Sequence, residues 1–494
     1  MISEQSLLSI KQMYKADLET TKNGISSWRL MKNAGRQVGK LALKILKKNS
    51  NRNILILCGP GNNGGDGYIA ANYLENNNYK VDIYSSQNPE KLTGDSKKAF
   101  KLWNNNVYNK LRKKDLLNYS LIIDSLFGAG ISRPLNKKIQ KIALWCEELS
   151  LNVLSVDIPS GINGDTGKPF GQIVIKAKNT ITFFRAKTGH KLYPGKEFCG
   201  QLHIANIGIK SEFIKSINIS VYNNHPSLWK KKIPKRTWNK NKYDFGHAVI
   251  FSGEMTGATM LASISCLRAG AGLVTILSPK EHEKAYRLFN PSLMILSSRL
   301  ESEKTNKFLS DKRINAVTYG FGCLPSFKTR KQTLEILKLK KPTVLDAGSL
   351  TSFSSKPETL YKACHINTIL TPHSGEFERI FPTLKNLTKL KACQEASKLT
   401  NSIVVFKGAD TIIAEPSGSS IISSDPFSPW LASAGTGDVL SGLITSMLAQ
   451  GLDCFDAAAA GVWIHNSAGK KIGPGLISND LVKKLKPVIQ KLHN

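Results

Sequence analysis

A run of small residues that ends in an acid, Ser433–Asp438, stands directly before the helix-forming residues Val439–Leu443. Glycines and small side chains let backbone N–H groups approach an anion at a helix N-terminus, where the helix dipole favours negative charge. A carboxylate beside such a nest can take a proton from a hydroxyl group while the nest holds the phosphate being transferred. The pattern indicates phosphoryl transfer with Asp438 as the base. The alternative is a glycine-rich helix start that serves only as a turn.

A second chemical pattern lies in the first half, where the apolar strand 54–58 runs into the glycine-rich stretch Gly59–Gly67 and then a helical segment, 68–74. Strand, glycine loop and helix in this order are typical of phosphate or nucleotide binding. Two further predicted strands, 121–124 and 153–157, end in acids. Because the carboxyl ends of parallel strands converge on one crevice, we expect four oxygen-bearing side chains to meet there and to suit a hard cation. These are Asn63, Asp124, Asp157 and Ser160.

The elements that must position these residues alternate between strand and helix in both halves, which predicts two α/β domains with parallel sheets. In the first half we expect strands at 54–58, 81–84, 121–124 and 153–157. In the second half we expect them at 248–251, 274–277, 316–319, 344–346, 368–370 and 403–406. Polar or glycine-rich loops follow several of the later strands: Phe251–Ala258, Gly320–Gly322, Asp346–Gly348, Thr371–Glu376 and Lys407–Thr411.

The composition places these domains in an ordinary globular protein of 494 residues, apart from a formal net charge of +33. Such charge can indicate nucleic-acid or membrane binding. The lysines are dispersed, however, and the basic stretch Lys230–Lys242 contains only Trp238 as a base-stacking side chain. We therefore expect neither a nucleic acid nor a membrane as a partner.

The eight cysteines contain no Cys-x-x-Cys pair, which argues against zinc and disulfides and fits a reducing cytoplasm. No apolar run reaches the length of a membrane span, and the N-terminus has no secretory pattern. A cytoplasmic enzyme is the expectation.

The first half resembles the epimerase domain of the NAD(P)H-hydrate repair enzymes in three motifs: Asn62–Gly67, Asp124–Gly130 and Val156–Gly161. Leu30–Gly35 is similar to the N-terminal helix of that family, with Lys32 where an acid is usual. The resemblance implies a Rossmann-like fold that epimerises C6 of hydrated NADH or NADPH, here called NADHX and NADPHX. It also implies a potassium ion at Asn63, Asp124 and Ser160. The implied substrate contacts are Asn62, Asn63, Gly64, Gly65, Asp66, Gly128, Ala129, Gly130, Ile131, Ser132, Arg133, Pro134 and Asp157. The chemistry favours Asp157 as the acid/base.

The second half resembles the dehydratase domain of the same enzymes, which has a ribokinase-like fold. The motifs are Thr256–Ala258, Arg268–Gly272, Gly320–Gly322, Thr371–Glu376 and Ala434–Asp438. Phe321 and Ser374 stand where the family has prolines, and Asp346–Gly348 is a loose form of its Asp-Ala-Asp stretch.

This second resemblance implies ADP as co-substrate, AMP as product and Mg²⁺ as cofactor. The residues implied to bind the hydrate are Ala258, Gly322, His373 and Asp438. Those implied to bind the nucleotide are Lys407, Gly408, Ala409, Asp410, Thr411 and Gly437.

Taken together, the two resemblances predict an epimerase domain at 1–215, a linker at 216–239 and a dehydratase domain at 240–494. A homo-oligomer is expected. The main alternative is a ribokinase-like kinase for another small molecule, fused to a nucleotide- or RNA-binding module.

Overall fold

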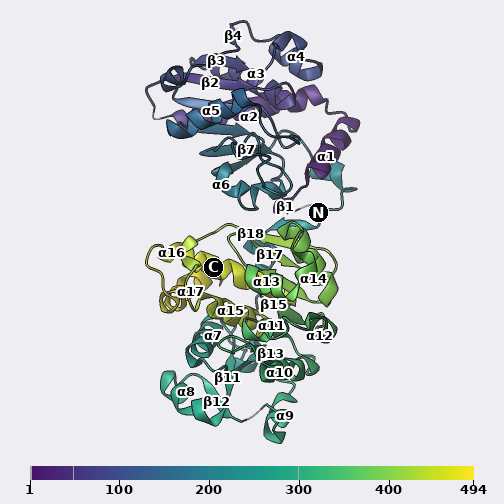
Figure 1. Cartoon of the computed structure of the whole chain (residues 1–494), viewed down its shortest axis with the longest axis vertical. Coiled ribbons are helices and arrows are strands. Elements are labelled where there is room, and N and C mark those ends of the chain that lie inside the picture. The colour runs from purple at the N-terminus through teal and green to yellow at the C-terminus, as the bar shows by residue number, and fades with distance from the viewer. Residues whose placement is uncertain (1–2, 48, 299, 494) are drawn as a thin grey trace. The chain divides into compact units, whose positions relative to one another are not determined.

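The computed structural model describes residues 3–47, 49–298 and 300–493. The chain forms two compact units, Met1–Val221 and Tyr222–Asn494 (Figure 1). Their boundary falls inside the segment 216–239 predicted as a linker. Trp229, within that segment, is fully buried in the core of the second unit, and its indole N–H donates a hydrogen bond of 3.1 Å to Asn224.

The first unit contains a seven-stranded sheet in the order β4-β3-β2-β5-β6-β7-β8, and every neighbouring pair is parallel. Its strands are β2 (Asn53–Cys58), β3 (Lys80–Ser85), β4 (Val107–Tyr108), β5 (Leu121–Ser125), β6 (Val153–Val156), β7 (Asn179–Phe183) and β8 (Gln201–Ala205). Its helices are α1 (Ile10–Lys22), α2 (Ser27–Leu46), α3 (Asn62–Glu75), α4 (Gly94–Phe100), α5 (Lys137–Glu148) and α6 (Gly195–Cys199).

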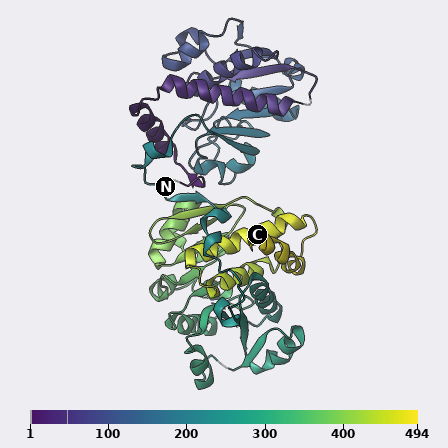
Figure 2. The same cartoon turned by 180° about the vertical axis from the view of Figure 1, so that it is seen from behind.

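Both faces of this sheet are covered, so alternate residues of the central strand enter different cores. Ile54 and Ile56 pack with α2 and α3, whereas Leu55 and Leu57 pack with α5. Figure 2 shows α2 along one face, and Figure 1 shows α5 on the other. Burial on both faces explains the uninterrupted apolar run of β2.

The topology reverses between β2 and β5, because β2 leads outward to β3 on one side while β5 leads to β6 on the other. In open α/β sheets the ligand crevice lies at this reversal. Two local predictions were wrong here. Residues 62–67 are the first turns of α3 and not a loop. Their glycines let the helix pack closely, since a Cβ at Gly64 or Gly67 would overlap atoms at the ends of β2 and β5. The strand β6 also ends at Val156, so Asp157 lies just beyond it.

The second unit contains strands in the order β18-β17-β16-β15-β14-β13-β10-β11-β12. The strands from β16 to β12 in this order are parallel to their neighbours, and β17 and β18 are added antiparallel. They are β10 (His247–Phe251), β11 (Leu273–Ser278), β12 (Met294–Ser297), β13 (Ile314–Tyr319), β14 (Thr343–Leu345), β15 (Thr368–Leu370), β16 (Ile403–Phe406), β17 (Thr411–Ala414) and β18 (Ser420–Ser423). The topology reverses between β10 and β13, and the predicted α/β class is confirmed for both units.

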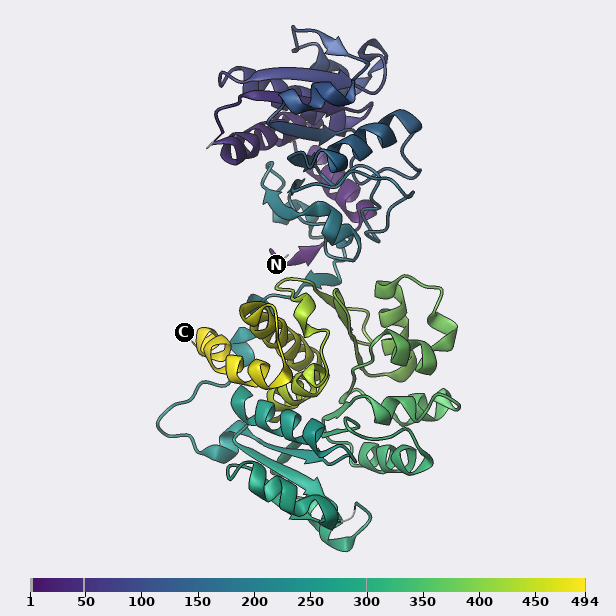
Figure 3. The same cartoon turned by 60° about the vertical axis from the view of Figure 1, so that its left-hand side comes forward.

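Helices cover both faces of this sheet too, as Figure 3 shows. One layer contains α7 (Thr256–Ala269), α15 (Thr436–Ala449), α16 (Cys454–Ile472) and α17 (Ser478–His493), which contact one another. The opposite layer contains α10 (Phe327–Lys338), α12 (Pro357–Ala363) and α14 (Lys389–Thr400). The remaining helices are short: α8 (Glu283–Phe289), α9 (Glu303–Leu309), α11 (Gly348–Thr351) and α13 (Ser374–Ile380).

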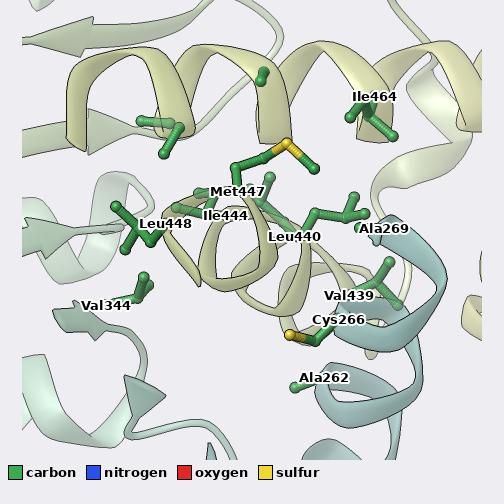
Figure 4. Close-up of a cluster of buried hydrophobic side chains, with 14 of the residues drawn as sticks. Ala262, Cys266, Ala269, Val344, Val439, Leu440, Ile444, Met447, Leu448 and Ile464 are labelled. Carbon is green, nitrogen blue, oxygen red and sulfur yellow. The ribbon is translucent and has the colours of Figure 1, made fainter. Parts of the chain in front are cut away.

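Helix α15 is the centre of the second core. Its apolar side chains pack against α7, α16 and β14, and Figure 4 shows Leu440, Ile444 and Met447 among them. Of its residues, only Gly437 and Asp438 are not buried. Helix α15 is therefore packed into the core along its length, and only its first turn, which carries the predicted base, is accessible. None of the helices in the described ranges has the length and apolar character needed to cross a bilayer.

Candidate functional site

A cavity of about 450 Å³ in the first unit opens at the carboxyl ends of β2, β5 and β6. Of the residues predicted to bind substrate, those that line it are Asn62, Asn63, Asp66, Gly128, Ala129, Gly130, Ile131 and Asp157. Gly64 and Gly65 are buried where α3 packs, and Ser132, Arg133 and Pro134 are exposed outside the lining. The structure thus brings the three predicted motifs together at one cavity.

Asp157 has a left-handed backbone, with φ of 68°, which is rare for a residue other than glycine. Its Oδ2 accepts a hydrogen bond of 2.8 Å from the Ala129 N–H, and its Oδ1 is ion-paired with the buried Lys187. Burial raises the pKa of Asp157, but the charge and hydrogen bond of Lys187 and the Ala129 N–H outweigh it and hold the pKa below its ordinary value. Asp157 is therefore an oriented carboxylate.

His190 fixes the backbone of this pair. Its Nδ1 accepts a hydrogen bond of 2.9 Å from the N–H of Lys187, so its Nε2 carries the proton that it donates to the Asp157 carbonyl at 2.7 Å. Burial, together with the charge of Lys187, lowers the pKa of His190 to about 4. A neutral histidine thus joins the two charged residues. The sequence interpretation missed Lys187 and His190. Both follow β7, a strand that was not predicted from the sequence.

The predicted cation ligands also lie together. The Asp124 carboxylate is fully buried and accepts hydrogen bonds from Ser155 and from both the N–H and the hydroxyl of Ser160. Burial raises its pKa despite these bonds. The amide nitrogen of Asn63 is buried with no hydrogen-bond partner among the described residues. The unpaired amide nitrogen is a donor and does not favour a cation, but the carboxylate and hydroxyl oxygens of Asp124 and Ser160 are of the kind that suits a monovalent hard cation.

In the second unit, Asp438 occupies the first turn of α15, after the left-handed N-cap residue Gly435. Burial and the charge of Asp346 raise the pKa of Asp438 to about 7, although Lys407 acts in the opposite direction. A carboxylate with a pKa near neutrality is well matched to general-base catalysis. The free N–H groups of the same turn make this end of the helix suitable for an anion.

A buried ion-pair network lies beside Asp438. The Nζ of Lys407 is 2.8 Å from Oδ1 of Asp346 and 3.9 Å from Oε2 of Glu376. Burial lowers the pKa of Lys407, but the two carboxylates outweigh it and raise the pKa overall. Lys407 was predicted to hold nucleotide phosphate. In the structure it is held by these acids. The sequence interpretation gave no role to Asp346 or Glu376.

The remaining predicted hydrate-binding residues lie on neighbouring loops. Gly322, in the loop after β13, has φ of 67°, and a Cβ built on it would lie 3.1 Å from the Cβ of Ala258 in the first turn of α7. Its carbonyl accepts a hydrogen bond of 2.9 Å from the N–H of Met255, the N-cap of α7. This contact lies at the topological reversal of the sheet. His373 is the N-cap of α13, and its Nε2 is 3.5 Å from Oε1 of Glu376. Glu376 thus connects His373 to Lys407.

The predicted nucleotide loop forms the connection from β16 to β17. The Lys407 N–H donates a hydrogen bond of 2.9 Å to the Pro372 carbonyl, and Thr411 is the first residue of β17. The Asp410 carboxylate pairs with Lys389 at 2.6 Å, so this acid fixes the loop. Gly437, on α15, lies close to the Lys407 ammonium group, since a Cβ built on this glycine would be 3.9 Å from Nζ.

For magnesium, the described residues contain no cluster of three or more His, Cys, Asp or Glu side chains that could hold a metal. The two neighbouring carboxylates of Asp346 and Asp438 nevertheless fit the usual arrangement for Mg²⁺, which binds one or two protein carboxylates together with nucleotide phosphates.

Comparison with known proteins gives a consistent result for both units. A family described as NAD(P)H-hydrate dehydratase matches residues 248–490, and one described as YjeF-related protein N-terminus matches residues 27–189. A bifunctional NAD(P)H-hydrate repair enzyme Nnr from Thermofilum pendens is 30% identical over 478 residues, covering 91% of this chain and 88% of that protein. The enzyme of the same name from Escherichia coli is 29% identical, covering 89% and 85%. A Bacillus subtilis structure titled ADP/ATP-dependent NAD(P)H-hydrate dehydratase is 23% identical with a TM-score of 0.47, covering 55% of this chain and 98% of that one.

Proposed function

This chain belongs to the family of bifunctional NAD(P)H-hydrate repair enzymes, and we propose that its two units perform successive steps of one repair. The first unit interconverts the R and S hydrates of NADH and NADPH. The second unit consumes the S hydrate and ADP, and releases the reduced dinucleotide, AMP and phosphate. Interconversion makes both stereoisomers available to a dehydratase that accepts only one.

Asp438 carries the proposed dehydration. Its carboxylate takes the proton of the 6-hydroxyl, and the oxygen attacks the terminal phosphorus of ADP while the bond to the AMP oxygen breaks. The N–H groups of the first turn of α15 stabilise the negative charge that develops on the transferred group. Loss of phosphate from C6 and a proton from C5 then restores the nicotinamide ring. Phosphate leaves far more readily than hydroxide, which is the reason for using ADP.

The supporting observation is a single unburied turn on an otherwise buried helix, with a carboxyl pKa of about 7. Hydrate binding is assigned to Ala258, Gly322 and His373, and nucleotide binding to the Lys407–Thr411 loop and Gly437. Lys407 has a further proposed role, since its charge lowers the pKa of Asp438. When bound, Mg²⁺ would supply positive charge to the phosphates beside Asp346 and Asp438.

In the first unit, we assign substrate binding and acid/base catalysis to Asp157. We assign potassium binding to Asn63, Asp124 and Ser160. Potassium bound there would compensate the buried Asp124 carboxylate and supply positive charge beside the substrate-binding loops. A homo-oligomer that binds neither nucleic acid nor membrane remains our prediction for the whole chain.

The direct test uses separated R and S hydrates with and without ADP. We expect recovery of reduced-nicotinamide absorbance from the S hydrate only when ADP is present, and R/S interconversion without it. If the protein leaves both hydrates unchanged with Mg²⁺, K⁺ and either ADP or ATP, the proposed function is wrong.

A further inference from the structure

A second carboxyl group, that of Asp17, lines the first cavity from helix α1. This helix begins directly after a backbone connection to the segment that carries Lys187. The Leu8 N–H donates a hydrogen bond of 3.0 Å to the Ala186 carbonyl, and Leu8 forms a parallel β-bridge with Lys187. The Ile10 N–H donates a hydrogen bond of 2.7 Å to the Asp165 carboxylate, and this bond fixes the start of α1. The fold therefore anchors the helix of Asp17 beside the Asp157–Lys187 pair.

The two carboxyl groups differ in how they are held. Both oxygens of Asp157 are occupied, by the Ala129 N–H on one side and by Lys187 and Thr182 on the other. Asp17, in contrast, has no side-chain hydrogen bond or ion pair within residues 3–47, 49–298 and 300–493. Burial raises its pKa to about 6, with Lys187 acting to lower it and Asp157 to raise it. A carboxyl group that faces a cavity without a partner is free to exchange a proton with a ligand.

The charged and titratable groups that line the cavity with Asp17 come from five elements. They are Tyr14 on α1, Asp66 on α3, Asp95 on α4, Asp157 after β6 and Lys187 after β7. Burial raises the pKa of Asp66 well above its ordinary value, and burial also raises that of Tyr14. Asp17 thus has a higher pKa than the ion-paired Asp157 and a lower pKa than Tyr14.

The epimerisation assigned to this unit requires an acid and a base. When the hydroxyl leaves C6, the C–O bond electrons go to oxygen, an acid supplies the proton that makes water, and the N1 lone pair forms an N1=C6 iminium. Water then adds to the opposite face and loses a proton. The oxonium first formed is strongly acidic, so a weak base is sufficient for this step. The departing hydroxide, however, needs a real proton donor near neutral pH.

Resting on the proposed epimerase function, we propose that Asp17 is the catalytic proton carrier on one face of the ring, where it protonates the departing hydroxyl of one stereoisomer. The Asp157–Lys187 pair serves the other face and accepts the proton of the incoming water. In the reverse direction the two roles exchange, and no proton is gained or lost over a full cycle. When the hydroxyl on the Asp17 face leaves, Asp17 is therefore the acid and Asp157 the base.

The test compares the full chain with its Asp17→Asn variant, starting from pure R hydrate without ADP and following the R/S ratio by chromatography. We expect kcat for epimerisation to fall by about 10²- to 10³-fold, with KM within twofold. The variant should also lose the decrease in kcat that the wild type shows above about pH 6. In H₂¹⁸O, the wild type should place the label at C6 as it epimerises.

Glu19→Gln is the matched control, because Glu19 lies on α1 and, among the residues that the structure describes, its carboxylate pairs with Lys22 alone, at 2.9 Å. It should epimerise at the wild-type rate. Binding of the R hydrate by equilibrium dialysis shows that the Asp17→Asn cavity is intact, and dehydration of the S hydrate with ADP reports on the second unit. The proposal is overturned if Asp17→Asn keeps kcat within threefold, if only KM changes, or if epimerisation proceeds without ¹⁸O incorporation. A wild type that does not epimerise at all refutes the proposed function instead.

Discussion

The hydroxyl of Ser441 donates a hydrogen bond of 2.7 Å to Oδ2 of Asp346. Ser441 lies one turn after Asp438 on α15, so this bond connects the helix that carries the proposed base to the end of β14. The other carboxylate oxygen of Asp346 is paired with Lys407. Asp346 therefore joins Lys407 to the helix that carries Asp438, and this contributes to the preorganisation that phosphoryl transfer requires.

Removal of the positive charge of Lys407 should reduce both the dehydration activity and the stability of the second unit. In Lys407→Met, the carboxylates of Asp346 and Glu376 lose their shared partner, and loss of one member of a buried pair costs about 3 kcal/mol of unfolding free energy. The pKa of Asp438 should rise, because Lys407 lowers it. We expect the acidic limb of the dehydration pH profile to move upward by about one unit.

The double variant Asp346→Asn/Lys407→Met is the control for this change. Removing Asp346 also removes the charge that raises the pKa of Asp438, so the acidic limb should return toward its wild-type position. A Lys407→Met enzyme with an unchanged pH profile would show that Lys407 does not act on the base.

The pH dependence of dehydration follows from the proposed role of Asp438. A general base acts in its ionised form, and its pKa is about 7. The rate constant kcat should therefore rise about tenfold per pH unit below pH 7 and level off above it. Single-turnover measurements with S hydrate and ADP from pH 5.5 to about 9 test this. A rate constant that is flat between pH 5.5 and about 7 would assign the base to another group.

A methyl group at Gly128 should block the first site selectively. A Cβ there would lie 2.8 Å from Oδ2 of Asp157 and 3.5 Å from Oδ1 of Asn63. Gly128→Ala should therefore displace Asp157 and reduce epimerisation by about 100-fold, since small misplacements of a reacting group have large effects. Dehydration of the S hydrate should stay unchanged.

Gly61→Ala is the comparison for this variant. Gly61 lines the same cavity, but no atom lies within 4 Å of a Cβ placed there. Its epimerisation should be close to that of the wild type. Equal losses in the two variants would mean that the cavity tolerates no added volume, whatever the position of Asp157.

Stability of the second unit should decrease in acid through His465. Its Nε2 is 2.9 Å from the Thr436 carbonyl at the start of α15, and burial lowers its pKa from 6.5 to about 4. Protonation therefore favours the unfolded state, and stability present above pH 6.5 is lost as the pH falls toward 4. At pH 5 we expect a loss of about 2 kcal/mol relative to pH 8, measured by urea unfolding. His465→Gln should lack this component. If the unfolding free energies of the wild type and of His465→Gln fall equally between pH 8 and pH 5, the assignment of this loss to His465 is wrong.

The sequence predicted the parts of the fold that depend on local pattern. All ten predicted strands are present, because buried parallel strands are continuous apolar runs bounded by glycine, proline or acids. The strands β4, β7, β8, β12, β17 and β18 were not predicted. In β7 polar threonines alternate with apolar residues, and β17 and β18 form a short antiparallel hairpin outside the strand–helix alternation.

The candidate sites were predictable where the residues follow strands and not where they depend on tertiary contacts. Asp157 and Asp438 stand in local motifs, so pattern and helix-end chemistry were sufficient. Lys187 and Asp17 come together only through the pairing of Leu8 with the Lys187 segment, which no local pattern reveals. The ion pairs of Lys407 were not predicted either, because its two acidic partners are distant in sequence.

The most direct test of the account is the Asp438→Asn variant of the full chain, assayed on separated R and S hydrates. Loss of the base should lower ADP-dependent recovery of the reduced dinucleotide from the S hydrate by about 10³-fold, while R and S hydrates still interconvert at the wild-type rate. ADP-dependent recovery from the S hydrate at more than a tenth of the wild-type rate would contradict the assignment of Asp438 as the base that starts phosphoryl transfer.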